Sequence, residues 1–309
     1  MRSRTPPRCQ RQAHCPRGGA ARPSYVSSPI KRERSTKAEV EARREALLDI
    51  IDDGKPMTVR QVFYQATVRG LVEKAETGYA KVQTDLTLMR RAGELPYDWL
   101  ADNTRWQRKP RTFDSVEAAL KETAAFYRKS LWTAADAYVE IWLEKDALAG
   151  VIYPITSMFD VPLMVARGYA SLSFLYNAAE YINDLDVPAY IYHLGDFDPS
   201  GVNAGEKIEE TLREMAPDAD IAFERIAVTP EQITEWNLPT RPTKASDSRS
   251  KGFGNISVEL DAIDPNQLRN LVQETIEQHL PAEQFEVLKA AEQSERAIIG
   301  HLVGSLAAS

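Results

Sequence analysis

The sequence predicts an α/β protein: an N-terminal helical unit followed by a mostly parallel sheet that is flanked by helices. Strand-like and helix-like segments alternate from residue 136 to about residue 228, as they do in the β-α units of parallel sheets. Before them, three helical segments follow one another between residues 37 and 91. The chain has 309 residues, which is long enough for two domains.

The first 37 residues form a basic tail. They contain ten Lys or Arg and one acidic residue, so they carry about +9 and the rest of the chain about −16, for a net charge of −7. Because they hold few large apolar residues, we expect residues 1–37 to be disordered. The tail is either a nonspecific DNA-binding arm or a solvated extension. The acidic body can bind DNA only where its basic groups are concentrated near the phosphates.

Three helices are predicted in the region 38–108. The first spans residues 37–53 and ends where Gly and Pro follow. The second spans residues 59 to about 69, after Thr58, whose hydroxyl can cap it. The third opens at Thr77 and runs to about residue 91, with a glycine after it.

The second helix carries a tyrosine away from its apolar side. Its apolar face consists of Val59, Val62, Phe63 and Ala66. Tyr64 lies off that face, and Arg60 precedes it by four residues, so the two are predicted to be neighbours on the exposed side. Tyr64 is then either a surface residue stacked on a guanidinium, or a nucleophile or DNA contact.

The third helix has an apolar face and a polar face. The inward residues are Tyr79, Val82, Leu86 and Met89, and the outward ones are Lys81, Thr84, Thr87 and Arg91. Three short helices followed by the Pro- and aromatic-containing segment 95–105 suggest a winged helix, whose third helix enters the major groove of DNA. The alternative is an ordinary solvated helix face. Residues 109–135 read as a linker with a helix at 116–131.

The region 136–309 reads as the α/β unit with C-terminal helices. Strands are predicted at 137–143, 162–166, 188–194 and 221–228, and helices at 146–158, 171–184, 200–215, 266–279 and 282–303. The polar loop 237–256 holds Arg241, Lys244, Arg249 and Lys251. That loop is either solvated and inert or a set of contacts to DNA phosphates.

Carboxylates follow two of the predicted strands. Glu144 comes directly after the first strand, and Asp196 and Asp198 follow the turn at Gly195. Open α/β sheets bind ligands outside the carboxyl ends of their strands, and carboxylate oxygens suit Mg²⁺. The three residues therefore predict an oxygen-ligand metal site. The alternative is a polar turn that caps the next helix, which Pro199 would begin.

Composition excludes several other classes. Hydrophobic residues make up 43% and charged residues 27%, as in ordinary soluble proteins. No apolar run is long enough to span a bilayer, and the N-terminus has no apolar core of a secretory signal. Both cysteines, Cys9 and Cys15, fall in the tail, so we expect neither a disulfide nor thiolate chemistry in the folded part. We expect a cytoplasmic protein without membrane contact.

Taken in order, several motifs resemble one known family. Glu144-Lys145-Asp146-Ala147, Arg167-Gly168-Tyr169 and the stretch from Gly195 to Gly201 look like a Toprim domain. This domain is similar to that of the topoisomerase VI A subunit and its meiotic double-strand-break relatives. In that family a winged helix with an Arg-x-x-(Tyr/Phe)-Tyr motif precedes the Toprim domain, and here Arg60-Gln61-Val62-Phe63-Tyr64 holds that place. The resemblance covers roughly residues 38–280.

The resemblance implies a type IIB topoisomerase A-subunit-like DNA transesterase. Tyr64 would be the nucleophile and Arg60 its catalytic partner, and Glu144, Asp196 and Asp198 would bind Mg²⁺. Double-stranded DNA would be the substrate, a homodimer would cut both strands, and any ATPase would be a separate ATP-binding B-type subunit. The candidate DNA-binding residues are Lys81, Thr84, Arg91, Arg167, Arg241, Lys244, Arg249 and Lys251.

The compact chain also resembles the small stand-alone A-like proteins of mobile genetic elements, and such an enzyme would be associated with the nucleoid. Two other functions remain open. A Toprim-type metal-dependent nuclease would use the same carboxylates to activate water, with Tyr64 as a DNA contact only. A non-cleaving DNA-binding protein would keep the DNA-binding surface and would not cut DNA.

Overall fold

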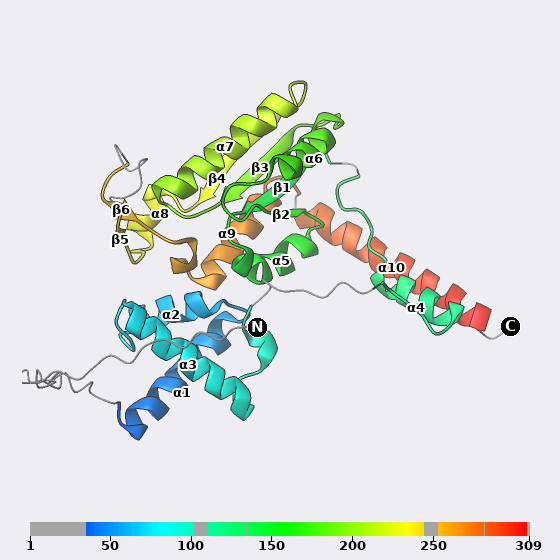
Figure 1. The fold of residues 1–309 in the computed structure, drawn as a ribbon. Coiled ribbons are helices and arrows are strands. Elements are labelled where there is room, and N and C mark those ends of the chain that lie inside the picture. The colour runs from blue at the N-terminus through cyan, green and yellow to red at the C-terminus, as the bar shows by residue number, and fades with distance from the viewer. Residues whose placement is uncertain (1–34, 102–109, 134, 244–252, 281, 308–309) are drawn as a thin grey trace, which may run out of the picture.

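The computed structural model describes residues 35–101, 110–133, 135–243, 253–280 and 282–307, and Figure 1 shows their fold. The predicted tail therefore lies almost wholly outside the described residues. So do Lys244, Arg249 and Lys251, and part of the segment 95–105.

The N-terminal unit consists of three helices, as predicted. They are α1 (Lys37–Gly54), α2 (Val59–Val68) and α3 (Glu76–Ala92), followed by a 3-10 turn at Tyr97–Trp99. Thr58 caps α2: its hydroxyl accepts the N–H of Gln61, and the Gln61 side chain accepts the N–H of Thr58. Gly93, at a φ of 76°, ends α3 in the left-handed conformation that glycine adopts without strain.

The centre of the molecule is a four-stranded parallel sheet. The strands are β1 (Tyr138–Leu143), β2 (Leu163–Val165), β3 (Ala189–Leu194) and β4 (Ile221–Ala227), in the order β2-β1-β3-β4. Every pair is parallel. The α/β class and the four strands predicted from the alternating pattern are confirmed.

Helices cover both faces of this sheet (Figure 1). On one face, α6 (Leu172–Asn183) and α7 (Pro199–Met215) pack on side chains such as Trp142 and Ile191. On the other face, α5 (Ala149–Met158) and α9 (Pro265–Glu277) pack on Ile141 and Leu143. The sheet is therefore buried between two apolar layers of helices, as expected for a parallel sheet.

The second apolar layer continues into the N-terminal helices. Leu47, Val62 and Met89 belong to the same buried cluster as residues of α5 and α9. The guanidinium of Arg269 on α9 donates to the carbonyls of Gly54 and Pro56, at 3.0 and 3.1 Å. The helical unit and the sheet therefore share one core.

Other elements differ from the prediction. The helix α4 (Val116–Phe126) ends five residues before the predicted Leu131, and an unpredicted helix α8 (Pro230–Glu235) follows β4. The predicted loop 237–256 contains the short strand β5 (Arg241–Pro242), and its last residue begins the antiparallel strand β6 (Ile256–Ser257). The long C-terminal helix α10 (Ala282–Ala307) packs along α4.

Among the described residues, no helix is long and apolar enough to cross a membrane. Within residues 35–101, the structure describes three helices and one isolated bridge between Met57 and Leu100. The N-terminal unit is therefore a three-helix unit, and the winged helix stays a prediction.

Candidate functional site

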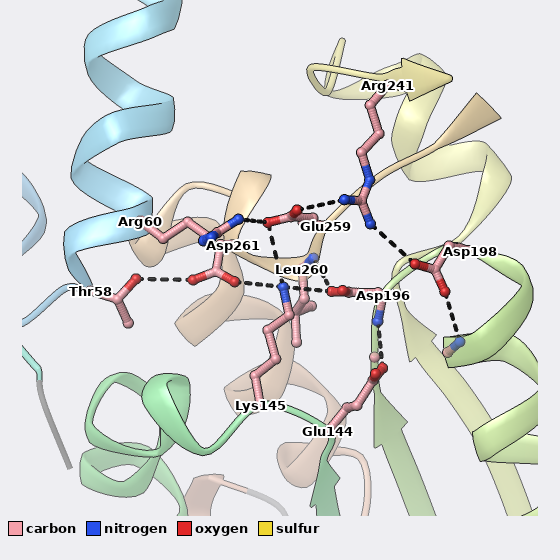
Figure 2. Close-up of polar contacts among 12 residues, drawn as sticks. Thr58, Arg60, Glu144, Lys145, Asp196, Asp198, Arg241, Glu259, Leu260 and Asp261 are labelled. Carbon is pink, nitrogen blue, oxygen red and sulfur yellow. Dashed lines mark hydrogen bonds and ion pairs between the residues drawn. The ribbon is translucent and has the colours of Figure 1, made fainter. Parts of the chain in front are cut away.

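Charged side chains gather at the carboxyl edge of the sheet, where β1 and β3 face the N-terminal helices (Figure 2). A cleft of about 590 Å³ opens there. It is lined by residues from α2, α3, the turn after β1, the turn after β3 and the segment 259–261, among them Arg60, Tyr79, Lys145, Asp196, Glu259 and Asp261. Residues nearly 200 positions apart thus meet in one cleft.

Glu144 is held in a niche next to the turn after β3. The N–H of Asp196 donates to its Oε2 at 2.8 Å. A Cβ on Gly195 would lie 2.6 Å from Oε2, and one on Gly201 would lie 3.0 Å from it, so only glycine leaves room for the carboxylate. Burial, and then the nearby charge of Asp196, raises the pKa of Glu144.

Asp196 lies at the centre of the site. Its Oδ1 accepts the N–H of Leu260 at 2.8 Å and pairs with the ammonium of Lys145, also at 2.8 Å. Burial raises the pKa of Asp196, and Lys145 opposes that rise. The side chain is therefore aimed at the segment 259–261 and not at the niche of Glu144.

Lys145 is the cation that holds the acidic cluster together. Its ammonium lies 2.7 Å from Asp261, 2.8 Å from Asp196 and 3.7 Å from Glu259. Burial lowers its pKa, but the negative charges around it outweigh burial, and the pKa of Lys145 is raised. The two carboxylates of Glu259 and Asp261 were not predicted from the sequence, although their acid-x-acid spacing repeats that of Asp196 and Asp198.

Two arginines extend this network to both sides. Arg60 on α2 pairs with Glu259 at 2.7 Å, and Arg241 pairs with Glu259 at 2.9 Å and with Asp198 at 3.1 Å. Although burial works in the opposite direction, Lys145 and Arg60 lower the pKa of Glu259. Ion pairs thus run without a break from the second helix to the sheet edge.

Asp198 caps the next helix, which is the alternative role that the sequence left open. Its Oδ1 accepts the N–H of Gly201 at 2.8 Å, and Pro199 is the first residue of α7. The side chain is therefore the N-cap of this helix, while its other oxygen pairs with Arg241.

The described residues contain no group of three or more His, Cys, Asp or Glu arranged to hold a metal ion. The oxygen chemistry of Glu144 and Asp196 nevertheless suits Mg²⁺. This ion is commonly bound through one or two carboxylates, with water and substrate phosphates completing its shell. Asp196, however, is turned to Lys145 and Leu260 and away from the niche of Glu144, so a Mg²⁺ site of Glu144, Asp196 and Asp198 stays a prediction.

The predicted exposure of Tyr64 is wrong. Tyr64 is only 4% exposed and belongs to the main core cluster. Its ring packs on Phe63, with the centroids 5.4 Å apart, and the ammonium of Lys74 lies 5.6 Å from the ring centre. The 3-10 turn Leu260–Ala262 contacts α2, and its Leu260 belongs to the same buried cluster as Tyr64. Burial raises the pKa of Tyr64 to about 12.

Tyr79 is also placed differently from the prediction. It is half-buried, packs on Phe63 and lines the cleft, with the guanidinium of Arg60 5.1 Å from its ring centre. Two tyrosines therefore flank Arg60. Tyr64 lies in the core and Tyr79 borders the cleft.

The candidate DNA contacts that the structure describes lie on the surface or in ion pairs. Lys81, Thr84 and Arg91 are exposed on α3, as predicted. Arg167 is exposed and pairs with Asp146 at 2.6 Å. Arg241, by contrast, is engaged by carboxylates of the cleft.

Sequence reasoning missed Arg225, which shapes the turn that carries the aspartates. From β4, its guanidinium donates to the carbonyls of Gly195 at 2.8 Å, Val228 at 3.2 Å and Gly201 at 3.3 Å, and also to that of Asp196. The sequence signal for it was a basic residue inside the predicted strand 221–228.

Replacing Arg225 by Met should loosen this turn. We expect the free energy of unfolding to fall by about 3 kcal/mol, because several charge-assisted hydrogen bonds to carbonyls are lost. Urea denaturation monitored by circular dichroism measures the change. Arg213→Met is the control, since Arg213 forms only an exposed pair with Glu209 and should change stability by less than about 1 kcal/mol. Equal stability of the two variants would contradict this role of Arg225.

No protein-family model and no curated protein matches this chain.

Proposed function

We propose that this protein is a type IIB topoisomerase A-subunit-like transesterase that cleaves duplex DNA. One observation supports this function above the others: the ion-pair chain from Arg60 through Glu259 and Lys145 to Asp196. It joins the helix that carries Tyr64 to the sheet edge that carries the candidate metal ligands. Cleavage of a phosphodiester by a tyrosine requires groups of both kinds around one phosphate.

The proposed reaction exchanges one phosphoester for another. The Tyr64 oxygen forms a bond to a backbone phosphorus and loses its proton, and the bond from phosphorus to the 3′ oxygen breaks. The 3′ oxygen takes up a proton, and the protein is left on the 5′ end of the DNA. The guanidinium of Arg60 would stabilise the charge that develops on the phosphate oxygens.

Glu144 and Asp196 would hold Mg²⁺, with Asp198 beside them. A bound ion would neutralise charge on the phosphate and on the leaving oxygen. Glu144 accepts the N–H of Asp196, and Asp198 accepts the N–H of Gly201. These hydrogen bonds orient the carboxylates of Glu144 and Asp198.

The proposal includes the finer features of the family. The three-helix unit would act as the winged helix, with Lys81, Thr84 and Arg91 of α3 facing the DNA. A homodimer would supply both cuts, and ATP hydrolysis would come from a separate B-type subunit. A nucleoid-associated enzyme of a mobile genetic element fits this role.

One observation favours a second function. Tyr64 is buried, and its pKa of about 12 disfavours the phenolate that attacks phosphorus. In a Toprim-type metal-dependent nuclease, water replaces the tyrosine as the nucleophile and needs no such phenolate. The carboxylates of the cleft would serve that reaction equally well.

One assay separates these functions. The full chain is incubated with supercoiled plasmid and Mg²⁺, denatured with detergent, and divided into samples with and without protease. DNA that migrates as broken molecules only after protease, and that carries protein on its 5′ ends, is the result expected of the transesterase. Broken DNA with free 5′ phosphates indicates the nuclease, and intact DNA indicates a non-cleaving binder.

Neutralising two basic residues of the segment 244–252 should weaken DNA binding. Arg249→Gln with Lys251→Gln is expected to lower affinity for all sequences alike, because each phosphate contact releases counterions. The slope of log affinity against log salt should fall by about 2, one for each contact. Fluorescence anisotropy with two unrelated duplexes at several salt concentrations measures both. An unchanged slope would remove this segment from the DNA interface.

A further inference from the structure

A second cavity, of about 550 Å³, lies between α6 and the starts of β1 and β2. The cleft described above opens at the other ends of these strands, so the two are separate. Its walls include four aromatic side chains and two acidic ones: Trp132, Tyr138, Phe174, Tyr181, Glu140 and Asp160.

Glu140 is the buried acidic side chain of this cavity. It is the third residue of β1 and only 2% exposed. The hydroxyl of Tyr138 donates to Oε1 at 2.8 Å, and the indole N–H of Trp142 donates to Oε2 at 2.7 Å. All three residues lie on the same face of the strand because side chains alternate along it.

Both of these partners are neutral. Of the residues that the structure describes, none with a positive charge pairs with Glu140. Each oxygen accepts one hydrogen bond and retains the capacity for another. Burial raises the pKa of Glu140, and the two donors oppose the rise. A buried carboxylate without a counter-charge is costly, and a cation from outside would remove that cost.

The aromatic walls suit the same kind of ligand. The rings of Tyr138 and Tyr181, which both line the cavity, are 5.3 Å apart. The ring of Phe174, also in its wall, packs on the buried Trp142 behind it, with the centroids 5.5 Å apart. The indole N–H of Trp132 is taken by the carbonyl of Phe159 at 2.7 Å. Aromatic faces attract organic cations and supply no oxygen ligands for a metal ion. Asp160, exposed beside the cavity, adds a second negative charge.

We propose that this cavity binds an alkylammonium group, with the ammonium against the Glu140 carboxylate and the alkyl chain between the aromatic walls. The group belongs either to a free amine or to a lysine side chain of a polypeptide. An anion would be repelled by the two carboxylates, and a neutral alcohol would leave the charge of Glu140 uncompensated.

The test titrates the full chain with n-butylammonium chloride and follows tryptophan fluorescence and ligand-observed NMR saturation transfer. n-Butanol is the uncharged control, and sodium chloride controls for ionic strength. We expect saturable binding of the ammonium that is at least about tenfold tighter than that of the alcohol. In a second arm, N-acetyl-lysine amide replaces n-butylammonium. Tighter binding of this compound assigns the site to a lysine side chain, and weaker binding assigns it to a free amine.

Two variants accompany the titration. Glu140→Gln keeps the shape of the side chain and should weaken binding of n-butylammonium about tenfold. Its melting temperature should equal or exceed that of the parent protein, since an unneutralised buried charge is gone. Tyr181→Ala, at a side chain that is 55% exposed, should fold normally and bind several-fold more weakly. Absence of saturable binding, or equal binding by the parent protein and Glu140→Gln, would overturn the proposal.

Discussion

Replacing Tyr64 by Phe is expected to reduce covalent capture of DNA to background while leaving the fold intact. The change removes one oxygen, the proposed nucleophile, and keeps the ring that packs on Phe63. Within the described part of the chain, no hydrogen bond involves the Tyr64 hydroxyl, so the free energy of unfolding should change by less than about 1 kcal/mol. Protease-dependent release of cleaved plasmid measures capture, and filter binding should show an unchanged affinity.

Tyr79→Phe is the informative comparison because Tyr79 borders the cleft beside the same arginine. We expect this variant to cut DNA as the parent protein does. If Tyr79→Phe loses capture and Tyr64→Phe retains it, the nucleophile is Tyr79. If both variants still cut, the metal-dependent nuclease replaces the transesterase.

Replacing Lys145 by Met should cause the largest loss of stability of any single change in the cleft. It leaves Asp196, Asp261 and Glu259 close together without their shared cation. Breaking a buried ion pair on one side leaves an uncompensated charge, and we expect a loss of about 3 to 5 kcal/mol at neutral pH. Urea denaturation measures it. Lys121→Met is the control, since Lys121 forms only an exposed pair with Glu117.

The loss should depend on pH in a defined direction. Lys145 has a raised pKa, so its stabilising effect is present below its ordinary pKa of 10.5 and disappears above it. Glu259 has a lowered pKa, so its share is present above its ordinary value of 4.5 and disappears in acid. The difference between the parent protein and Lys145→Met should therefore be largest between these values.

Mg²⁺ should stabilise Lys145→Met more than the parent protein, because the change frees Asp196, which with Glu144 is a proposed Mg²⁺ ligand, from its ion pair. Thermal melts with and without Mg²⁺ measure this. Equal responses of the two proteins would count against a metal site among these carboxylates. Unchanged stability of Lys145→Met would show that the network around it contributes little.

The sheet could be predicted from the sequence because short apolar runs separated by helical patterns are a local signal. Each end of the four strands was placed within one residue of its observed position. Helix α4 ends before the predicted residue, and the helix α8 and the pairing of β5 with β6 were missed. These last features are short, and pairing across a long connection leaves no local pattern.

The environment of Tyr64 could not be predicted for a similar reason. A helical wheel shows which side of α2 is apolar, but not what covers the other side. Part of the cluster that buries Tyr64 comes from Leu260, almost 200 residues later in the chain. The acidic turns after β1 and β3 were visible as motifs in the sequence. The ion pairs of Lys145 were not, because two of its partners, Glu259 and Asp261, lie more than 100 residues later. Only the folded chain brings those together.

The core that the helical unit shares with the sheet bears on how the protein unfolds. With α9 bound to the end of α1 through Arg269, neither part has a complete apolar interior of its own. Both parts should therefore melt in one cooperative calorimetric transition. A fragment limited to the sheet and its helices would lose the part of this shared core that α1, α2 and α3 supply, and it would be prone to aggregate.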